Sequence, residues 1–368
     1  MLRLRRGSSR DPRLGLDMSE GTRSGATHLT PVSTDELSGI LREASQKSLN
    51  VTVVGGGTRQ GYGTPVEPDL VVDMGRFADI ETWDPDDLTV TLGAGTLVAE
   101  LESMLSSRSQ SAVLSEIPGD STVGGSIAAG ISSLRRARLL GTRERMLEVT
   151  LVTGDGRVVR AGGRVVKNVS GFDIPRLVVG SFGSLGVITS VCLKLWSAPR
   201  ASATVTIDDL ETASQVKRPL AVLEENQRRR VFLWGTPEEV EASSTRLGGD
   251  YVDGLDWPTD PAGPHRWSLR VPPAQTSEAL SRLPGDWRFL AIHGAGEIRA
   301  SSASAKGAAD LREWAEGTGG SLVVVDAPDG SQFDPWGKPP PALELQKKLI
   351  AEFDPARVIN AGRLPGGL

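Results

Sequence analysis

A short β-branched strand runs directly into a glycine-rich loop, and this junction constrains the fold more than any other feature of the sequence. The apolar run Val51–Val54 is followed by Gly55, Gly56, Gly57, Thr58, Arg59, Gln60 and Gly61. Because glycine adopts backbone conformations closed to other residues, successive N–H groups in such a loop can point into one concavity and hold an anion. The loop does not fit the G-x-G-x-x-G fingerprint, since its sixth position is Gln60, nor the GxxxxGK[ST] pattern. Taken alone, it indicates either an anion site or a structural turn.

Two further glycine clusters lie at residues 118–126 and 180–186. The first precedes the small-residue run 127–130, and the second precedes a predicted strand at 187–195. Each cluster alone is more often a packing device, but three at strand or helix edges favour one large shared ligand, a dinucleotide. Residues 88–95 imitate a nicotinamide-binding unit, but Val98 stands where that unit needs Gly or Ala, so we interpret them as structural.

Composition and charge narrow the function classes. The 368 residues carry 41 Lys and Arg against 46 Asp and Glu, a net charge of −5, which argues against a nucleic-acid-binding surface. One cysteine, Cys192, excludes an internal disulfide and a cysteine-ligated cluster, and we expect it in the core of a strand. The three histidines (His28, His265 and His293) are far apart, so no metal site is predicted.

Periodicity and composition divide the chain into segments. We expect a leader at residues 1–27 with order starting near Leu29, a first domain at 28–199, a second at 200–325, a linker at 326–341, and a helix with a tail at 342–368. In the first domain we predict a helix that begins with a capping box at Ser33, a helix over 97–105 capped by Thr96, and a hairpin over 147–160. Strands are predicted at 51–54, 70–73, 88–92 and 187–195. Residues 228–230, three arginines, are interpreted as a solvated face or a partner contact.

The three clusters together resemble a known family. Gly-Gly-Gly-Thr at 55–58, Ser-Thr-Val-Gly-Gly at 121–125 and Gly-Ser-Leu-Gly-Val-Ile-Thr at 183–189 are similar to the FAD-binding domain of the vanillyl-alcohol oxidase/p-cresol methylhydroxylase (PCMH) superfamily. Arg135-Arg136, the runs 162–173 and 176–181, and the tail 353–363 resemble the FAD-binding (E-type) subunit of bacterial glycolate oxidase. The resemblance covers residues 30–200 and 340–364 and is weaker between them.

The resemblance implies an α+β fold: a PCMH-type FAD-binding domain of two subdomains with a smaller α+β cap domain. It implies FAD, held non-covalently because neither loop contains a histidine. The first loop would cradle the pyrophosphate, the second would contact the diphosphate and the ring edge, the third would hold the ring and adenine side, and Asn360 would return from the tail. The cofactor-binding residues implied in this way are Gly55, Gly56, Gly57, Thr58, Arg59, Gln60, Gly61, Pro118, Gly119, Ser121, Thr122, Gly124, Gly125, Ser126, Gly183, Gly186, Val187, Ile188 and Asn360.

The resemblance also implies an activity: oxidation of a small 2-hydroxy acid, glycolate or D-lactate, by hydride transfer to the flavin and electron passage to a partner. The implied partners are a second flavin subunit and an iron–sulfur subunit. The implied location is cytoplasmic, with contact to the inner membrane through those partners. The related catalytic subunits have a histidine-rich motif that is absent here, so no catalytic residue is assigned and His293 is the only candidate base. Two alternatives stay open: an FAD-binding assembly or electron-relay subunit without a substrate site, and a stand-alone oxidoreductase of the same fold acting on another alcohol.

Overall fold

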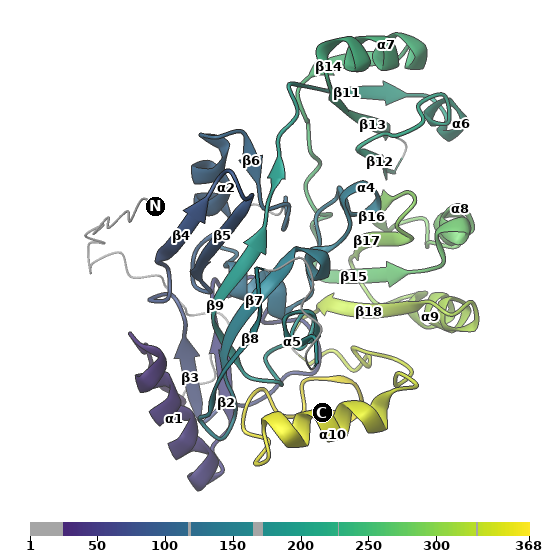
Figure 1. Ribbon diagram of the computed structural model, residues 1–368. Helices are drawn as coiled ribbons and strands as arrows, with labels where there is room; N and C mark the ends of the chain where they lie inside the picture. Colours follow the sequence, from purple (N-terminus) through teal and green to yellow (C-terminus); the bar gives the residue numbers. More distant parts are fainter. Residues whose placement is uncertain (1–24, 117–118, 165–171, 227, 329) are drawn as a thin grey trace.

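The computed structural model describes residues 25–116, 119–164, 172–226, 228–328 and 330–368 (Figure 1). Most of the predicted leader, Pro118 and residues 165–171 of the family-like run lie outside these ranges. The first strand includes Thr27 and therefore begins before the expected start at Leu29. Within the described residues, no helix has both the length and the hydropathy needed to cross a membrane.

A three-stranded parallel sheet and one helix form the N-terminal part of the fold. The elements are β1 (Thr27–Leu29), α1 (Thr34–Lys47), β2 (Val51–Val54) and β3 (Leu70–Asp73), with the strand order β1-β3-β2. The Ser33 hydroxyl accepts a hydrogen bond from the Glu36 N–H at the start of α1, as the capping box predicts. The Glu36 carboxylate bonds the Val32 N–H, one residue before the position that a capping box requires.

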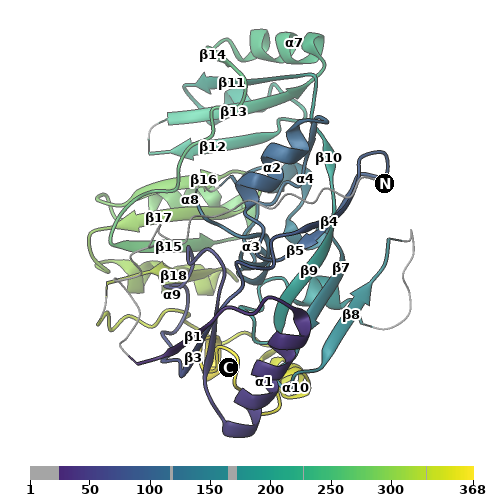
Figure 2. The same cartoon turned by 90° about the vertical axis from the view of Figure 1, so that its left-hand side faces the viewer.

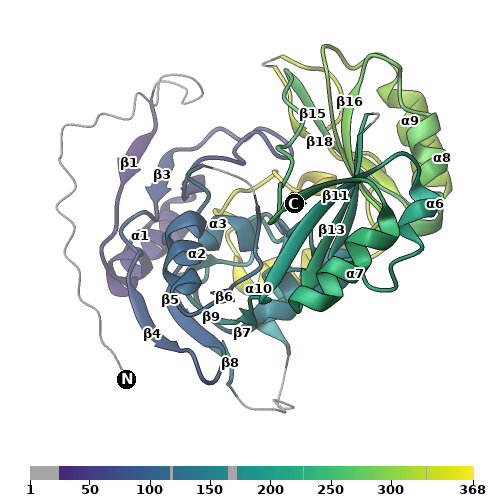
Figure 3. The same cartoon turned by 90° about the horizontal axis from the view of Figure 1, so that it is seen from above.

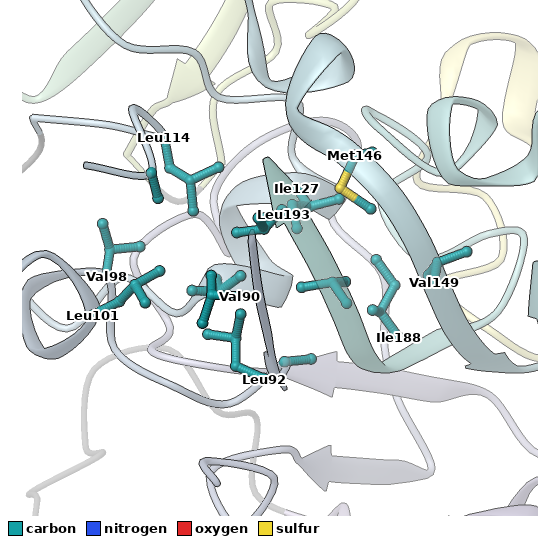
Figure 4. Packing of buried hydrophobic residues seen from close by; sticks show 14 of the residues in the cluster. Val90, Leu92, Val98, Leu101, Leu114, Ile127, Met146, Val149, Ile188 and Leu193 are labelled. Atoms are coloured by element: carbon teal, nitrogen blue, oxygen red, sulfur yellow. The ribbon is translucent and has the colours of Figure 1, made fainter. Parts of the chain in front are cut away.

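A five-stranded antiparallel sheet follows, with the strand order β4-β5-β9-β7-β8. Its elements, with the helices and short strand between them, are β4 (Ile80–Asp84), β5 (Thr89–Gly93), α2 (Val98–Ser106), β6 (Gln110–Ser111), α3 (Val123–Ala128), α4 (Arg136–Leu139), η1 (Thr142–Arg145), β7 (Met146–Val152), β8 (Val158–Gly162), α5 (Ile174–Leu177), β9 (Val187–Lys194) and β10 (Trp196–Ser197). The hairpin predicted at 147–160 is β7–β8, and its turn contains Gly156 at φ +82°. One core joins α2 and α3 to the sheet through residues such as Leu92, Leu101 and Ile127 (Figure 4).

An eight-stranded antiparallel sheet contains the strands of residues 201–326, in the order β14-β11-β13-β12-β16-β17-β15-β18. Its elements are β11 (Ala201–Ile207), α6 (Leu210–Ala213), β12 (Ala221–Glu225), β13 (Arg228–Gly235), α7 (Pro237–Leu247), β14 (Asp250–Asp253), β15 (His265–Arg270), η2 (Pro273–Gln275), α8 (Thr276–Ser281), β16 (Arg288–Ile292), β17 (Glu297–Ser302), α9 (Ala308–Gly317) and β18 (Ser321–Asp326). Figure 3 shows α8 and α9 on the face of this sheet that is turned away from the N-terminal part. The opposite face is therefore free to contribute to a site between the sheets.

The C-terminal segment returns to the N-terminal sheet. After α10 (Leu343–Phe353), the Val51 N–H bonds the Val358 carbonyl at 2.7 Å and the Asn360 N–H bonds the Val51 carbonyl at 2.8 Å. The chain ends in η3 (Pro365–Gly367), and Figures 1 and 2 both place α10 at the same end of the molecule as α1. Residues 358–360 thus lie beside β2, directly below the first glycine loop.

Three sequence-based expectations need correction or detail. Thr96 does not cap α2, because the N-cap position is Leu97 and the Thr96 hydroxyl has no hydrogen-bond partner among the described residues. Arg230 is not solvated: its side chain is buried and pairs with Glu225 and Asp256, since strand alternation turns it inward from β13. Residues 326–341 pack against the fold, where the Trp336 indole N–H donates to the Arg363 carbonyl at 2.7 Å.

Candidate functional site

A cavity lies where the three glycine clusters meet. Its empty volume is about 870 Å³, part of it open to solvent. The sequence-predicted residues that line it are Gly55, Gly56, Gly57, Thr58, Arg59, Gln60, Ser121, Thr122, Gly124, Gly125, Ser126, Gly183, Gly186, Val187, Ile188 and Asn360. Clusters separated by more than a hundred residues are therefore walls of one cavity, which we call the first cavity.

Close backbone packing brings the first two clusters together. A Cβ on Gly56 would lie 1.4 Å from the Asp120 carbonyl oxygen, and one on Gly55 would lie 2.2 Å from the Thr122 hydroxyl oxygen. The Thr58 and Ser121 hydroxyl oxygens are 3.1 Å apart across the same junction. Gly57 differs, because its φ is +72° and a Cβ there would meet nothing within 4 Å. Gly55 and Gly56 thus build the wall, whereas Gly57 faces open space.

Asn360 presents a buried acceptor at the cavity. Its side-chain N–H donates to the Phe182 carbonyl at 2.7 Å, and its side chain is almost fully buried. Among the described residues, its Oδ1 has no hydrogen-bond partner. Because buried polar atoms are nearly always satisfied in native proteins, this oxygen fits a ligand that brings an N–H or O–H donor. A flavin carries such donors on its ring and its ribityl chain.

Arg363 is a cavity residue that the sequence analysis missed. Its buried guanidinium donates to the carbonyl oxygens of Arg59, Gln60 and Tyr62 at 2.7–3.0 Å, and it has no carboxylate partner among the described residues. Burial lowers the pKa of Arg363 to about 10, so it stays charged at neutral pH. It fixes the first glycine loop and leaves a positive charge beside it, which suits a bound diphosphate. The sequence signal was its place three residues after Asn360 in the family-like tail.

The other missed residues are apolar or small and carry no distinguishing sequence signal. They are Val53, Met74, Ala94, Ala128, Ala129, Ile131 and Phe182.

Two predicted contacts, Gly61 and Gly119, do not line the first cavity. Gly61 faces β18 instead, because a Cβ there would lie 2.3 Å from an Asp326 carboxylate oxygen. Gly119 has φ +100° and open space around it, but it is not part of the lining. Pro118 lies outside the described residues.

A second cavity adjoins the first and shares Arg59, Ala129 and Ile131 with it. Its empty volume is about 580 Å³, part of it open to solvent. Strand alternation supplies its polar wall, since Arg266, Ser268 and Arg270 of β15 and Glu297 and Arg299 of β17 lie on the face opposite the α8–α9 core. That pattern is visible in the sequence as polar residues at every second position of His265–Arg270 and Glu297–Ser302.

Most charged side chains around the second cavity form ion pairs with one another. Glu297 bonds Arg136 at 2.5 Å and Arg299 at 3.1 Å, and Asp260 bonds Arg299 at 2.8 Å. Burial alone would raise the pKa of Glu297, but Arg299, Arg270 and Arg136 lower it to about 2. Burial disfavours the charged form of Arg299, yet Glu297 and Asp260 raise its pKa above the ordinary value. Arg59 lies 3.6 Å from Asp260 and connects this network to the first glycine loop.

His293 does not line either cavity. Its Nε2 lies 2.9 Å from a Glu224 carboxylate oxygen, and Glu224 also pairs with Arg229. Its ring is therefore held by Glu224 outside both cavities, and its role as a base stays a prediction. Cys192 is fully buried in β9 as expected, and burial raises the pKa of its thiol. Among the described residues, no cluster of His, Cys, Asp or Glu could hold a metal ion.

Comparisons with known proteins agree with this geometry. The family model described as an FAD binding domain matches residues 26–162. Glycolate oxidase subunit GlcE of Escherichia coli is 28% identical over 88% of this chain and 95% of that subunit. D-lactate dehydrogenase of Archaeoglobus fulgidus is 32% identical and glycolate oxidase subunit GlcD of Bacillus subtilis 31% identical, each over about half of this chain. The chain spans only 40% and 41% of the length of these two relatives.

A solved structure of alkyldihydroxyacetonephosphate synthase superposes with a TM-score of 0.64 at 15% identity, covering 90% of this chain and 75% of that one. This likeness supports the fold alone, a mixed α/β architecture. The first cavity fits the cofactor, because it combines the unpaired Asn360 oxygen, the Arg363 charge and a glycine lining that lets backbone approach a flat ligand. Residues 26–162 are thus an FAD binding domain, in a chain that is similar to glycolate oxidase subunits and to a D-lactate dehydrogenase.

Proposed function

We propose that the chain is the FAD-binding subunit of a complex that oxidises a small 2-hydroxy acid, with glycolate or D-lactate as the substrate. The observation that carries this proposal is the shared wall of the two cavities at Arg59, Ala129 and Ile131. A substrate in the second cavity would lie next to a flavin in the first. The bound flavin would supply the acceptor for the hydride that leaves the hydroxyl-bearing carbon.

The proposed roles of this chain's residues are binding and orientation. Residues 55–60 with Arg363 would hold the diphosphate, residues 121–126 and 183–188 would enclose the ring and its ribityl chain, and Asn360 would accept a donor from the flavin. In the second cavity, arginines face the space in which an acid substrate would lie. Trp267 and Ala300 add apolar surface to the lining.

The described lining of the second cavity offers no free proton acceptor for the substrate hydroxyl. The described lining of the second cavity contains no histidine, and its two carboxylates, Asp260 and Glu297, are each bound by arginines. General-base catalysis contributes about 10²–10⁴-fold, so we expect the chain alone to oxidise the acid very slowly. We therefore propose that turnover and electron passage need partner subunits: a second flavin subunit and, because this chain has a single cysteine, a separate iron–sulfur subunit. Such a complex would be cytoplasmic and contact the inner membrane through its partners.

The lack of a histidine or a free carboxylate in the described lining of the second cavity favours one alternative, an FAD-binding assembly or relay subunit that never binds substrate. Stopped-flow reduction of the bound flavin by glycolate and by D-lactate separates the two. We expect slow bleaching of the chain alone and fast bleaching when the partner subunits are present. Rapid bleaching of the chain alone would show a complete active site and contradict the need for partners. A flavin of this chain that no hydroxy acid reduces, even in the complex, would favour the relay alternative.

A further inference from the structure

We propose that the second cavity binds the carboxylate of a small organic acid between the guanidinium of Arg270 and the hydroxyl of Tyr62. This inference assigns a site to residues that the sequence analysis did not single out. Only the identity of the acid, a 2-hydroxy acid, rests on the proposed function. Three observations support the site: a cation with no carboxylate partner among the described residues, a neutral donor in the same lining, and the position of both in a cavity that adjoins the first.

Arg270 is the cation. The other arginines of the lining are paired: Arg266 with Asp326 at 2.6 Å, and Arg299 and Arg59 with Asp260 at 2.8 and 3.6 Å. Among the described residues, no carboxylate lies within ion-pair distance of the Arg270 guanidinium. Glu297 stands directly opposite Arg270 in the β15–β17 register, but its oxygens bond Arg136 and Arg299 instead. Arg270 is exposed, so it lies where the cavity opens to solvent and an anion can reach it.

Tyr62 is the neutral donor. It comes from the first glycine loop and is fixed by its ring contact with Phe182, at 5.0 Å between centroids, and by its carbonyl, which accepts from Arg363 at 3.0 Å. Burial raises the pKa of the phenol, although the charge of Arg270 and a hydrogen bond with Ser268 oppose this. The phenol is therefore protonated at neutral pH and can donate to an anion. Tyr62 and Arg270 both line the second cavity, so one ligand there can contact both side chains.

The combination suits a carboxylate. A guanidinium offers two parallel N–H donors to two carboxylate oxygens, and a phenol adds a third, directional donor. Four arginines line the cavity against the two carboxylates of Asp260 and Glu297, so the lining is net positive and attracts an anion. Next to the first cavity the lining consists of Ala129, Gly130, Ile131 and Arg59, and Arg59 is already paired with Asp260, so the far end of a small acid would face mainly small and apolar groups there.

The test is equilibrium binding of oxamate, a monocarboxylate that the flavin cannot oxidise, to the FAD-loaded chain. Binding is followed by calorimetry and by the change in the flavin absorption spectrum. We expect Arg270→Gln to raise the dissociation constant at least tenfold, Tyr62→Phe to raise it several-fold, and Arg270→Lys to fall between Arg270→Gln and the wild type. The control is Arg288→Gln on β16 of the same sheet, an exposed arginine that lines neither cavity, and it should bind oxamate like the wild type.

The FAD content of each variant is measured first, so that a loss of flavin is not mistaken for a loss of oxamate binding. We expect Arg270→Gln to keep its flavin, since Arg270 does not line the first cavity. Equal oxamate affinity in Arg270→Gln, Arg288→Gln and the wild type would overturn the inference, and so would a wild-type chain that does not bind oxamate. Either result would leave the proposed function standing if glycolate still reduced the flavin in the complete complex. Conversely, oxamate binding that depends on Arg270, in a chain whose flavin no hydroxy acid reduces, would support this site and contradict the proposed function.

Discussion

Neighbouring glycines of the first loop have different physical reasons for being glycine. Gly57 has φ +72°, and a side chain there would enter open space at the first cavity. Gly56 has no unusual φ, but a Cβ would lie 1.4 Å from the Asp120 carbonyl oxygen. Replacing Gly57 should therefore affect the ligand, whereas replacing Gly56 should affect the fold.

We predict that Gly57→Ala raises the dissociation constant for FAD by about tenfold or more, with a loss of about 1 kcal/mol in stability from the left-handed backbone. FAD titration of the apoprotein and thermal unfolding measure the two effects. Gly248→Ala is the matched control, because Gly248 has φ +67° and open space but ends α7, away from the cavity. Equal FAD affinity of the two variants would show that Gly57 does not face the cofactor. Gly56→Ala should instead act mainly on the fold and lower the unfolding temperature, because its Cβ would clash with the Asp120 carbonyl oxygen.

For single residues, the sequence predicted which segments meet at the cavity but not which side chain contacts which. Glycine clusters are visible as composition, so residues 55–60, 121–126 and 183–188 could be named in advance. Gly61 could not be separated from its neighbours, because its contact is Asp326, more than two hundred residues away. Arg270 and Tyr62 were missed because their significance depends on which carboxylates other arginines have already paired with. Such pairing is a property of the packed fold, and no local pattern encodes it.

Among the secondary-structure elements, α10 and the turn after it hold the tail against β2. Asp354 follows α10 with its side chain buried, and its Oδ2 accepts from the Ile359 N–H at 2.8 Å. Its Oδ1 has no hydrogen-bond partner among the described residues. A Cβ added to Gly154 would lie 2.0 Å from this oxygen, so the two segments pack closely here. Burial raises the pKa of Asp354 although backbone N–H groups and Arg357 lower it.

The direction of this pKa shift sets the pH dependence. The folded state favours the protonated carboxyl, so its contribution to stability is present below the unfolded pKa and is lost as pH rises through the raised folded pKa. We predict that Asp354→Asn is as stable as the wild type or more stable at neutral pH, because it keeps an acceptor for Ile359 without a buried charge. Asp354→Ala should lose about 1–3 kcal/mol, since the Ile359 N–H is then left unsatisfied. Thermal unfolding at pH 5 and pH 8 measures both, and an Asn variant less stable than the Ala variant would refute this account.

Element boundaries in the first part of the chain were predicted better than those in the second. Val51–Val54 and Leu70–Asp73 are strands with the expected bounds, because buried parallel strands form short, continuous β-branched runs. The cap of α2 was wrong, since Thr96 is buried and Leu97 takes the cap position without a side-chain bond. For the second domain the sequence analysis predicted only an α+β class, because the strand order β14-β11-β13-β12-β16-β17-β15-β18 depends on pairings between strands distant in the chain.

At the scale of the whole molecule, Glu297 joins the eight-stranded sheet to the FAD-binding part. Its carboxylate on β17 bonds Arg136 of α4 at 2.5 Å and Arg299 at 3.1 Å, and Arg299 in turn donates to the Ser132 carbonyl at 3.1 Å. The second cavity lies between the parts that these bonds connect. The geometry of that cavity should therefore depend on the charge of one buried carboxylate.

We predict that this contact fails in acid. Burial alone would raise the pKa of Glu297, but Arg299, Arg270 and Arg136 lower it to about 2, so its contribution is present above the unfolded value of 4.5 and is lost as pH falls from there towards 2. The shift corresponds to a loss on the order of 3 kcal/mol. Glu297→Gln should be several kcal/mol less stable than the wild type at neutral pH, because Arg136 then loses its carboxylate partner and the buried Arg299 keeps only Asp260. Its stability should fall less steeply between pH 4.5 and 2. Glu278→Gln, which removes an exposed helical pair with Arg282, is the control and should change stability by less than about 1 kcal/mol with an unaltered acid slope. Thermal unfolding across this pH range measures all three proteins, and identical acid slopes for Glu297→Gln and the wild type would show that Glu297 does not control the junction.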